Sequence, residues 1–293
     1  LLHKTFKQHA FNYKDEVSAN TPPLLGREPV PNLIREAGGE VAYLLFTSGS
    51  TGIPKGVPIT HSNICSYIDF ILRQFSFSSQ DRFSQFFDLS FDPSLHDLFV
   101  CWAVGGCLCV VPDEQIFFPA QFIKEKKLTV WYSAPSVVPI MSQMRLLKEN
   151  SFPLLRYSFF SAEALTLSTL EKWEHAAPAS TIVNLYGPTE TTVNISFYVW
   201  DKNKPESLSG NIPIGKVFKT HEYCIIADNM KEVEKGEEGE LCVSGAQVFE
   251  GYLNDVEKTK TALIPILTTH NSQLLTNIWY RTGDMVQKDD TGN

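Results

Sequence analysis

A short apolar run followed at once by a loop of small and hydroxylated residues constrains this chain most. Residues 41–46 are continuously apolar, which is typical of a buried strand when turn residues bound the run. The sequence then reads Thr-Ser-Gly-Ser-Thr-Gly-Ile-Pro-Lys-Gly over residues 47–56. Its glycines let the backbone turn tightly, while its hydroxyls, exposed N–H groups and Lys55 can hold phosphate oxygens. The segment therefore predicts a phosphate-binding loop behind a buried strand.

The spacing of this loop excludes two better-known phosphate loops. A Walker A loop needs G-x-x-x-x-G-K-[ST], whereas Lys55 lies three residues after Gly52 and precedes Gly56. The G-x-G-x-x-G pattern of dinucleotide sites fails as well. A flexible surface loop is the alternative, but such loops seldom place Pro-Lys-Gly directly behind a buried strand.

The remaining pattern predicts an α/β region followed by a β-rich one. A helix is expected to start at Thr60 or Ser62, because Ile64, Ile68 and Ile71 recur at helical spacing. Between about 80 and 195, strand-like and helical stretches alternate as in an α/β sheet. The expected strands are 108–111, 130–133, 157–160 and 181–185, and the expected helices are 120–126 and 167–175. Beyond 196, the strand-like segments are 197–200, 222–227, 239–244 and 278–281.

These segments predict a division of the chain into three parts. Residues 1–40 read as a partial N-terminal segment and linker, since prolines interrupt them. Residues 41–196 are expected to form an α/β subdomain that binds nucleotide and substrate. Residues 197–293 are expected to form a β-rich subdomain.

Composition narrows the class of function. With 25 Lys and Arg against 33 Asp and Glu, the net charge is −8 and no basic run occurs, so no nucleic-acid partner is expected. The start of the chain lacks an apolar signal segment, and the longest apolar run is too short to span a bilayer. Six scattered cysteines form no disulfide scaffold or zinc pattern. We expect a cytoplasmic protein without a membrane partner.

Four motifs together resemble one family. Residues 43–56 are similar to the signature loop of the adenylate-forming superfamily, which includes acyl-CoA synthetases, luciferases and nonribosomal peptide synthetase adenylation domains. Residues 186–191 resemble its Y-G-P-T-E-T segment, and 280–284 its Y-R-T-G-D segment. Residues 239–245 followed by 251–254 resemble its G-E-L-x-x-x-G…G-Y-L segment. The motifs stand in the family's order across residues 40–293, and the peptide synthetase adenylation domains are the most similar group.

The resemblance implies a fold and an activity. The fold is the large-lobe core of these enzymes, an α/β arrangement of mixed sheets followed by a β-rich, distorted-barrel subdomain. The activity is conversion of a carboxylic acid, an amino acid here, into its adenylate with ATP and Mg²⁺, releasing pyrophosphate. The acyl group would then pass to the phosphopantetheine thiol of a carrier protein. Since carboxylate and phosphate are both anions, catalysis needs charge neutralisation and positioning.

The resemblance also assigns the ATP side of the site. Catalytic roles fall to Lys55, Thr189, which contacts the α-phosphate, and Glu190, which binds Mg²⁺ as a single carboxylate ligand. Tyr186 stacks on adenine and Asp284 accepts hydrogen bonds from the ribose hydroxyls. The other expected nucleotide-binding residues are Thr47, Ser48, Gly49, Ser50, Thr51, Gly52, Ala162, Glu163 and Gly187. Ser161-Ala162-Glu163 stands where the family has Gly-Gly-Glu, which reduces backbone freedom beside the adenine.

Residues 91–94, Phe-Asp-Pro-Ser, resemble the segment that begins the pocket of amino-acid-activating members. There the aspartate pairs with the substrate α-ammonium, so Asp92 receives that role. The earlier Asp88 fits the same short pattern, but we expect it to cap a helix. The register places the side-chain pocket at Pro93, His96, Tyr132, Phe159, Ser161, Leu185, Val193 and Asn194. The mixed lining favours a polar or aromatic amino acid over an aliphatic one.

Departures from the family leave two alternatives open. The chain stops soon after Asp284, before the small C-terminal lobe of the family with its catalytic lysine, and its first forty residues are shorter than the family's N-terminal region. We therefore expect a core piece, truncated at both ends, that binds ATP and substrate but catalyses poorly alone. One alternative is an acyl- or aryl-CoA ligase, which would not need Asp92 for an ammonium. The other is a catalytically incompetent binding fragment.

Overall fold

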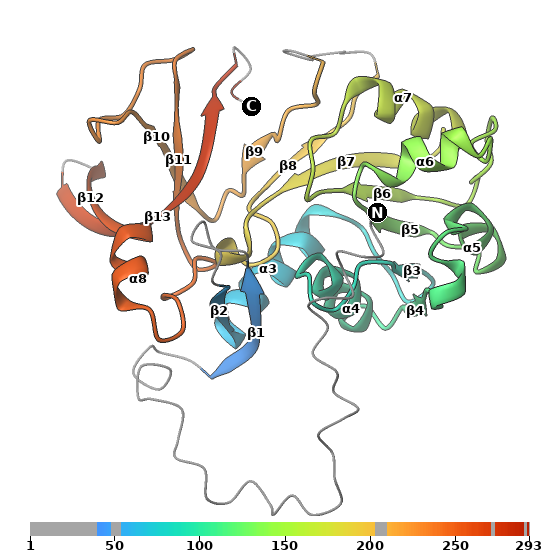
Figure 1. Cartoon of the computed structure of the whole chain (residues 1–293), viewed down its shortest axis with the longest axis horizontal. Helices are drawn as coiled ribbons and strands as arrows, with labels where there is room; N and C mark the ends of the chain where they lie inside the picture. Colours follow the sequence, from blue (N-terminus) through green and yellow to red (C-terminus); the bar gives the residue numbers. More distant parts are fainter. Residues whose placement is uncertain (1–39, 48–53, 203–209, 271–272, 290–291, 293) are drawn as a thin grey trace, which may run out of the picture. The chain divides into compact units, whose positions relative to one another are not determined.

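The largest sheet of the described structure is a mixed sheet of seven strands. The computed structural model describes residues 40–293 except 48–53, 203–209, 271–272, 290–291 and 293 (Figure 1). The strand order is β4-β3-β5-β6-β7-β8-β9, with parallel pairing as far as β7 and antiparallel pairing beyond it. The strands are β3 (Arg82–Gln85), β4 (Cys107–Val110), β5 (Val130–Ser133), β6 (Tyr157–Phe160), β7 (Thr181–Tyr186), β8 (Ser196–Val199) and β9 (Lys216–Val217).

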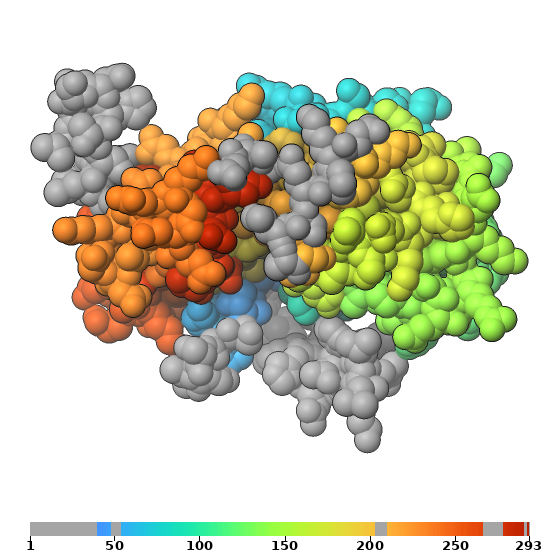
Figure 2. Space-filling view, turned by 90° about the horizontal axis from the view of Figure 1, so that it is seen from above, coloured from blue at the N-terminus to red at the C-terminus, as the bar shows by residue number. Residues whose placement is uncertain are grey.

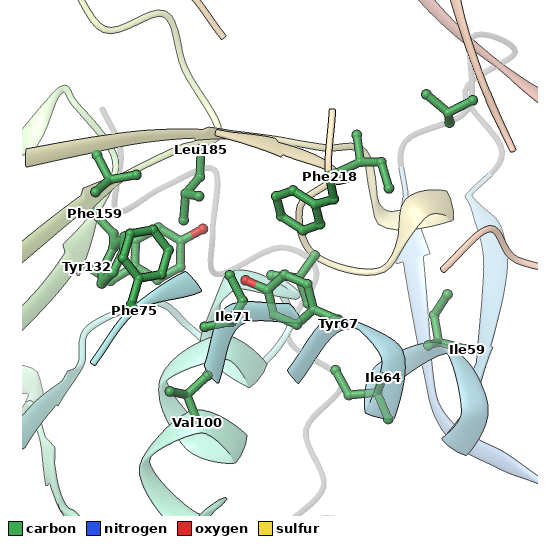
Figure 3. Packing of buried hydrophobic residues seen from close by; sticks show 14 of the residues in the cluster. Ile59, Ile64, Tyr67, Ile71, Phe75, Val100, Tyr132, Phe159, Leu185 and Phe218 are labelled. Atoms are coloured by element: carbon green, nitrogen blue, oxygen red, sulfur yellow. The ribbon is translucent and has the colours of Figure 1, made fainter. Parts of the chain in front are cut away.

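Helices cover both faces of this sheet, because its central strands are apolar on both sides. On β5, Val130 and Tyr132 join one hydrophobic cluster while Trp131 joins the other. The first cluster includes α3 (His61–Gln74) and α4 (Pro93–Ala103). The second includes α5 (Pro119–Glu125), α6 (Val137–Gln143) and α7 (Leu167–Ala176). Figure 3 shows the first cluster, in which Tyr132, Phe159 and Leu185 of the sheet face Tyr67 and Ile71 of α3.

Two smaller sheets complete the fold. β1 (Val41–Thr47) and β2 (Lys55–Thr60) form an antiparallel hairpin ahead of α3. The other sheet is antiparallel with the order β10-β11-β13-β12, comprising β10 (Glu222–Ile226), β11 (Glu238–Ser244), β12 (Leu263–His270) and β13 (Gln273–Gln287). α8 (Val256–Ala262) precedes β12, and one-turn 3₁₀ helices occur at η1 (Asp113–Gln115) and η2 (Thr189–Thr191). In the space-filling view, the orange and red residues of the antiparallel sheet form one side of the surface (Figure 2).

Most expected elements are confirmed, and the omissions have local causes. Thr60 is the cap of α3, since its side chain accepts from the Asn63 N–H and Asn63 reciprocates. The strands expected at 130–133 and 157–160 have the expected bounds. The sequence did not predict β3, β9, β12, α4, α6 or α8. α8 has no buried residue and hence no apolar stripe to detect.

The expected border at residue 197 does not coincide with a change of sheet. β8 and β9 extend the seven-stranded sheet through antiparallel pairing, so the change of sheet falls between Val217 and Glu222. Tyr198 of β8 is buried in the second hydrophobic cluster and Phe197 packs against the first, so β8 contacts both clusters as the central strands do. Residues 39–293 form one compact unit. The division of this unit into subdomains stays a prediction.

Candidate active site

The β1–β2 hairpin holds the two ends of the expected phosphate loop together. Thr47 ends β1, Lys55 begins β2, and the two residues are paired across the hairpin. The hydroxyl of Thr47 is buried and has no hydrogen-bond partner among the described residues. Ser48, Gly49, Ser50, Thr51 and Gly52 lie outside the described residues. The expected strand ahead of the loop is thus confirmed, and a second strand follows the loop.

Lys55 reaches the expected magnesium ligand through a tyrosine of a third motif. Its ammonium nitrogen lies 3.8 Å from Glu190 Oε1 and donates to the Tyr252 hydroxyl at 3.1 Å. That hydroxyl donates to the same Glu190 oxygen at 2.7 Å. The side chain of Glu190 is only 5% exposed, so its charge depends on these partners. Residues from three separate motifs therefore share one cluster, Lys55–Tyr252–Glu190, which we call the charged cluster.

Tyr186 and Asp284, the expected adenine and ribose contacts, also meet. The Tyr186 hydroxyl donates to Asp284 Oδ2 at 2.6 Å, although the two residues are 98 positions apart. Burial, followed by the hydrogen bond to Asp284, raises the pKa of Tyr186, so the hydroxyl keeps its proton. A Cβ at Gly187 would lie 2.5 Å from the Asn194 Cα, which explains the glycine. The contact joins the seven-stranded sheet to β13 next to the charged cluster's Glu190.

Asp92 occupies the N-cap position of α4, but its buried carboxylate does not cap the helix. It precedes α4 without a side-chain capping bond, and its Oδ2 instead accepts from the Val193 N–H at 3.2 Å. Burial raises the pKa of Asp92 to about 7, against the lowering effect of hydrogen bonds from Val193 and Thr189. Thr189 thus links this carboxylate to the segment that carries Glu190. The prediction that Asp88 caps a helix is wrong, because Asp88 is exposed and accepts from the Ser90 N–H in a turn ahead of α4.

The expected pocket residues are buried together. All eight of these side chains are buried: Pro93, His96, Tyr132, Phe159, Ser161, Leu185, Val193 and Asn194. The polar ones are hydrogen-bonded to one another, since Asn194 Nδ2 donates to the Tyr132 hydroxyl at 3.0 Å and that hydroxyl lies 2.6 Å from Ser161 Oγ. Packing of His96 against Tyr132 and Phe159 completes the group, with ring centroids 4.9 and 5.2 Å apart.

The segment in place of Gly-Gly-Glu is anchored to α6. Glu163 accepts from the Ser136 N–H at 3.0 Å and from the Ser136 hydroxyl at 3.1 Å. Ala162 has a positive φ of 72°, the left-handed conformation that glycine adopts without strain. The backbone at residue 162 therefore has a conformation that glycine favours, and the Cβ of Ala162 makes this conformation strained. The adenine contact assigned to both residues stays a prediction.

Three residues that the sequence analysis did not select support the site. Gln247 is fully buried, and its Nε2 donates to the carbonyls of Thr191 and Asn194. It thereby holds a segment in which Thr192 and Val193 both have positive φ. The sequence could have indicated Tyr252, because it belongs to the Gly-Tyr-Leu motif of residues 251–253. Gln247 and the α3 residue Tyr67 lie outside every motif, so the sequence could not have indicated them.

The metal assignment rests on Glu190. Among the described residues, no group of three or more His, Cys, Asp and Glu side chains is arranged to hold a metal ion. A single buried carboxylate fits Mg²⁺, which usually takes one or two protein carboxylates and completes its shell with phosphates and water. No helix in the described ranges is long and apolar enough to cross a membrane.

The β1–β2 hairpin, the charged cluster and the Tyr186–Asp284 pair come together on an α/β fold, the arrangement predicted above for a nucleotide site. The sequence matches the family described as "AMP-binding enzyme" over residues 4–253. The chain belongs to this AMP-binding family.

Individual relatives agree with this assignment. An L-proline–[L-prolyl-carrier protein] ligase of Pseudomonas fluorescens is 31% identical over 92% of this chain and 50% of its own length. A D-alanine–D-alanyl carrier protein ligase of Bacillus licheniformis is 34% identical over 86% of this chain and 49% of its own length. The Vibrio cholerae adenylation domain AlmE, solved with glycyl-adenosine-5'-phosphate, matches with a TM-score of 0.78 and 37% identity over 86% of this chain and 47% of that one. The chain spans about half the length of these relatives.

Proposed function

We propose that this protein activates an amino acid as its aminoacyl-adenylate, using ATP and Mg²⁺ and releasing pyrophosphate. The activated acyl group is then loaded onto the thiol of a carrier protein. The observation that carries the proposal is the convergence of separate motifs: Lys55, Tyr252 and Glu190 form one cluster, while Tyr186 contacts Asp284. Together these residues offer one ATP molecule a cation for its phosphates in Lys55, a carboxylate for its Mg²⁺ in Glu190, and an acceptor for its ribose hydroxyls in Asp284.

The reaction joins two anions, and this chain's residues serve to reduce their repulsion. A substrate carboxylate oxygen forms a bond to the α-phosphorus as the bond to the bridging oxygen of pyrophosphate breaks. Lys55 offers positive charge to the departing phosphates, and Thr189 offers a hydroxyl close to the α-phosphate. Glu190 would hold Mg²⁺, which, when bound, neutralises phosphate charge. Asp92 holds the substrate's ammonium and so orients its carboxylate.

Asp92 favours an amino acid over a fatty or aryl acid. A carboxylate buried to 7% exposure costs free energy unless a cation or donors compensate it. Among the described residues, Asp92 accepts from the Val193 N–H and Thr189, and none of them gives it a cationic partner as Lys55 does for Glu190. A substrate ammonium supplies that partner. The named substrates of the two ligases above, proline and D-alanine, are amino acids as well.

Pyrophosphate exchange tests the proposal. The chain and the longest natural form of the protein are incubated with ATP, labelled pyrophosphate and one acid at a time, chosen from amino acids, fatty acids and aryl acids. Label is expected in ATP only with one or a few amino acids. Exchange with fatty or aryl acids alone would establish the CoA-ligase alternative. ATP binding without exchange by either form would establish the incompetent binding fragment.

A further inference from the structure

A chain of hydrogen bonds runs through the buried pocket and centres on Tyr67 of α3. The Tyr67 hydroxyl lies 2.7 Å from His96 Nδ1 and accepts from Asn194 Nδ2 at 3.2 Å. The same Asn194 nitrogen donates to Tyr132, which contacts Ser161. All five side chains are at most 2% exposed. We call Tyr67, His96, Tyr132, Ser161 and Asn194 the pocket network.

The hydrogens of this network can be assigned by counting donors and acceptors. Asn194 Nδ2 has two hydrogens, and the two tyrosine hydroxyls accept them. The single hydrogen of the Tyr67 hydroxyl then has one acceptor among its described partners, His96 Nδ1. Burial lowers the pKa of His96 to about 3, so its ring is neutral and carries its one hydrogen on Nε2. Tyr67 thereby selects the tautomer of His96 and the orientation of the Asn194 amide.

Two atoms of the network are left over. His96 Nε2, a donor in this tautomer, and Asn194 Oδ1, an acceptor, are both buried without a hydrogen-bond partner among the described residues. Buried polar atoms without partners are rare, because each costs free energy. The next residue of α4, Asp97, is fully buried, and burial raises the pKa of its carboxyl well above the usual range. The leftover pair is therefore one donor and one acceptor, and neither group carries a charge.

We propose that Tyr67 is a positioning residue for substrate selection, and that the selected amino acid has a neutral side chain bearing a hydroxyl or a carboxamide. Such a side chain carries both a donor and an acceptor, which are the partners that Asn194 Oδ1 and His96 Nε2 lack. An apolar side chain of the same shape leaves both unpartnered. The inference rests on the proposed function and adds a substrate class to it.

Calorimetry with stable adenylate analogues separates this inference from the function it rests on. The chain is titrated with aminoacyl-sulfamoyl adenosines in shape-matched pairs: threonyl against valyl, asparaginyl against leucyl, and glycyl as the side-chain-free reference. We expect the polar member of at least one pair to bind about tenfold or more tightly than its apolar partner and than glycyl. Binding of no analogue overturns the proposed function itself. Binding that favours the apolar members or glycyl overturns only the substrate class.

Tyr67→Phe tests the positioning role. It removes one hydroxyl, leaving His96 Nδ1 and one Asn194 hydrogen without a partner, so the polar-to-apolar affinity ratio should fall about tenfold while affinity for ATP is unchanged. Tyr157→Phe is the matched control, because its hydroxyl accepts from the Ser76 N–H outside the network. That control should keep the wild-type ratio, and circular dichroism verifies that both variants are folded. A Tyr67→Phe protein with the wild-type ratio overturns the role.

Discussion

The two halves of the candidate site hold their polar groups in different ways. In the pocket network, neutral side chains are almost fully buried and hydrogen-bonded to one another. In the charged cluster, Lys55 is 22% exposed and pairs with Glu190 across 3.8 Å. Neutral buried groups make a fixed shape that can discriminate between substrates. Charged groups that compensate each other can exchange partners when phosphate and metal arrive.

The largest effect should come from the charged half. Lys55→Ala removes the cation offered to the phosphates, and pyrophosphate exchange should fall about a hundredfold or more, as when a transition-state contact is lost. Affinity for the preferred aminoacyl-sulfamoyl adenosine, which has no β- or γ-phosphate, should hardly change. Lys260→Ala is the control, because Lys260 pairs with Glu257 on the exposed face of α8. A loss of exchange activity below tenfold would show that Lys55 has no catalytic role.

The next largest effect should come from Asp92, whose influence on amino-acid affinity should depend on pH. Burial raises the pKa of Asp92 to about 7, so below pH 7 the empty site is protonated and must lose that proton to pair with an ammonium. The Kd of the amino acid should therefore improve by up to about tenfold per pH unit between pH 5 and 7 and level off above. Asp92→Asn should bind at least about tenfold more weakly at pH 8, with a flat profile.

The pH dependence of the stability of the ligand-free protein gives an independent test of the raised pKa of Asp92. An aspartate with a pKa raised by folding binds more protons in the native state than in the unfolded state between its two pKa values. Its contribution to stability is thus present at low pH, declines between the ordinary pKa of 3.8 and about 7, and levels off above that. Denaturant unfolding from pH 5 to 8 should show a steeper decline in wild type than in Asp92→Asn. Equal slopes would mean that Asp92 is ionised throughout.

Tyr252 should matter less than Lys55, because it orients charges without supplying one. Tyr252→Phe removes the hydroxyl that bridges Lys55 and Glu190. We expect exchange to fall about tenfold, corresponding to the loss of a hydrogen bond to a charged group, with the KM for ATP rising more than the KM for the amino acid. A change confined to the amino-acid KM would contradict the separation of the two halves.

The smallest effect should be on stability alone. Ala162 adopts a φ of 72°, so Ala162→Gly relieves the strain of a Cβ in the left-handed region. The free energy of unfolding should rise by about 1 kcal/mol, measured by chemical denaturation. Ala164→Gly in the same exposed turn has no positive φ to relieve and should not stabilise the protein. Equal changes in both variants would show that no strain is stored at Ala162.

The sequence predicted the two halves of the site unequally. Short motifs identified Lys55, Glu190, Tyr186 and Asp284, and the structure brings these residues into two contacts. Buried strands such as β5 were predictable because they are apolar on both faces. The pocket residues followed only from the register after Asp92, yet they prove to be buried together.

What could not be predicted depends on contacts between distant segments. Tyr67 reads as one more apolar position of an amphipathic helix, and nothing local shows that its hydroxyl meets His96 and Asn194. Gln247 lies between motifs, and only the fold brings its amide to the carbonyls of Thr191 and Asn194. Sheet membership of β8 was hidden for the same reason, since antiparallel pairing with β7 leaves no signature within the strand.

Titration of the chain with a non-hydrolysable ATP analogue and Mg²⁺ tests the central claim most directly. If the hairpin loop, the charged cluster and Asp284 surround one nucleotide, calorimetry will show one site per chain. Lys55→Ala and Asp284→Asn will each weaken that site about tenfold or more, while Lys260→Ala will not. Unchanged affinity in both of the first two variants, or no binding by the wild-type chain, would contradict the claim.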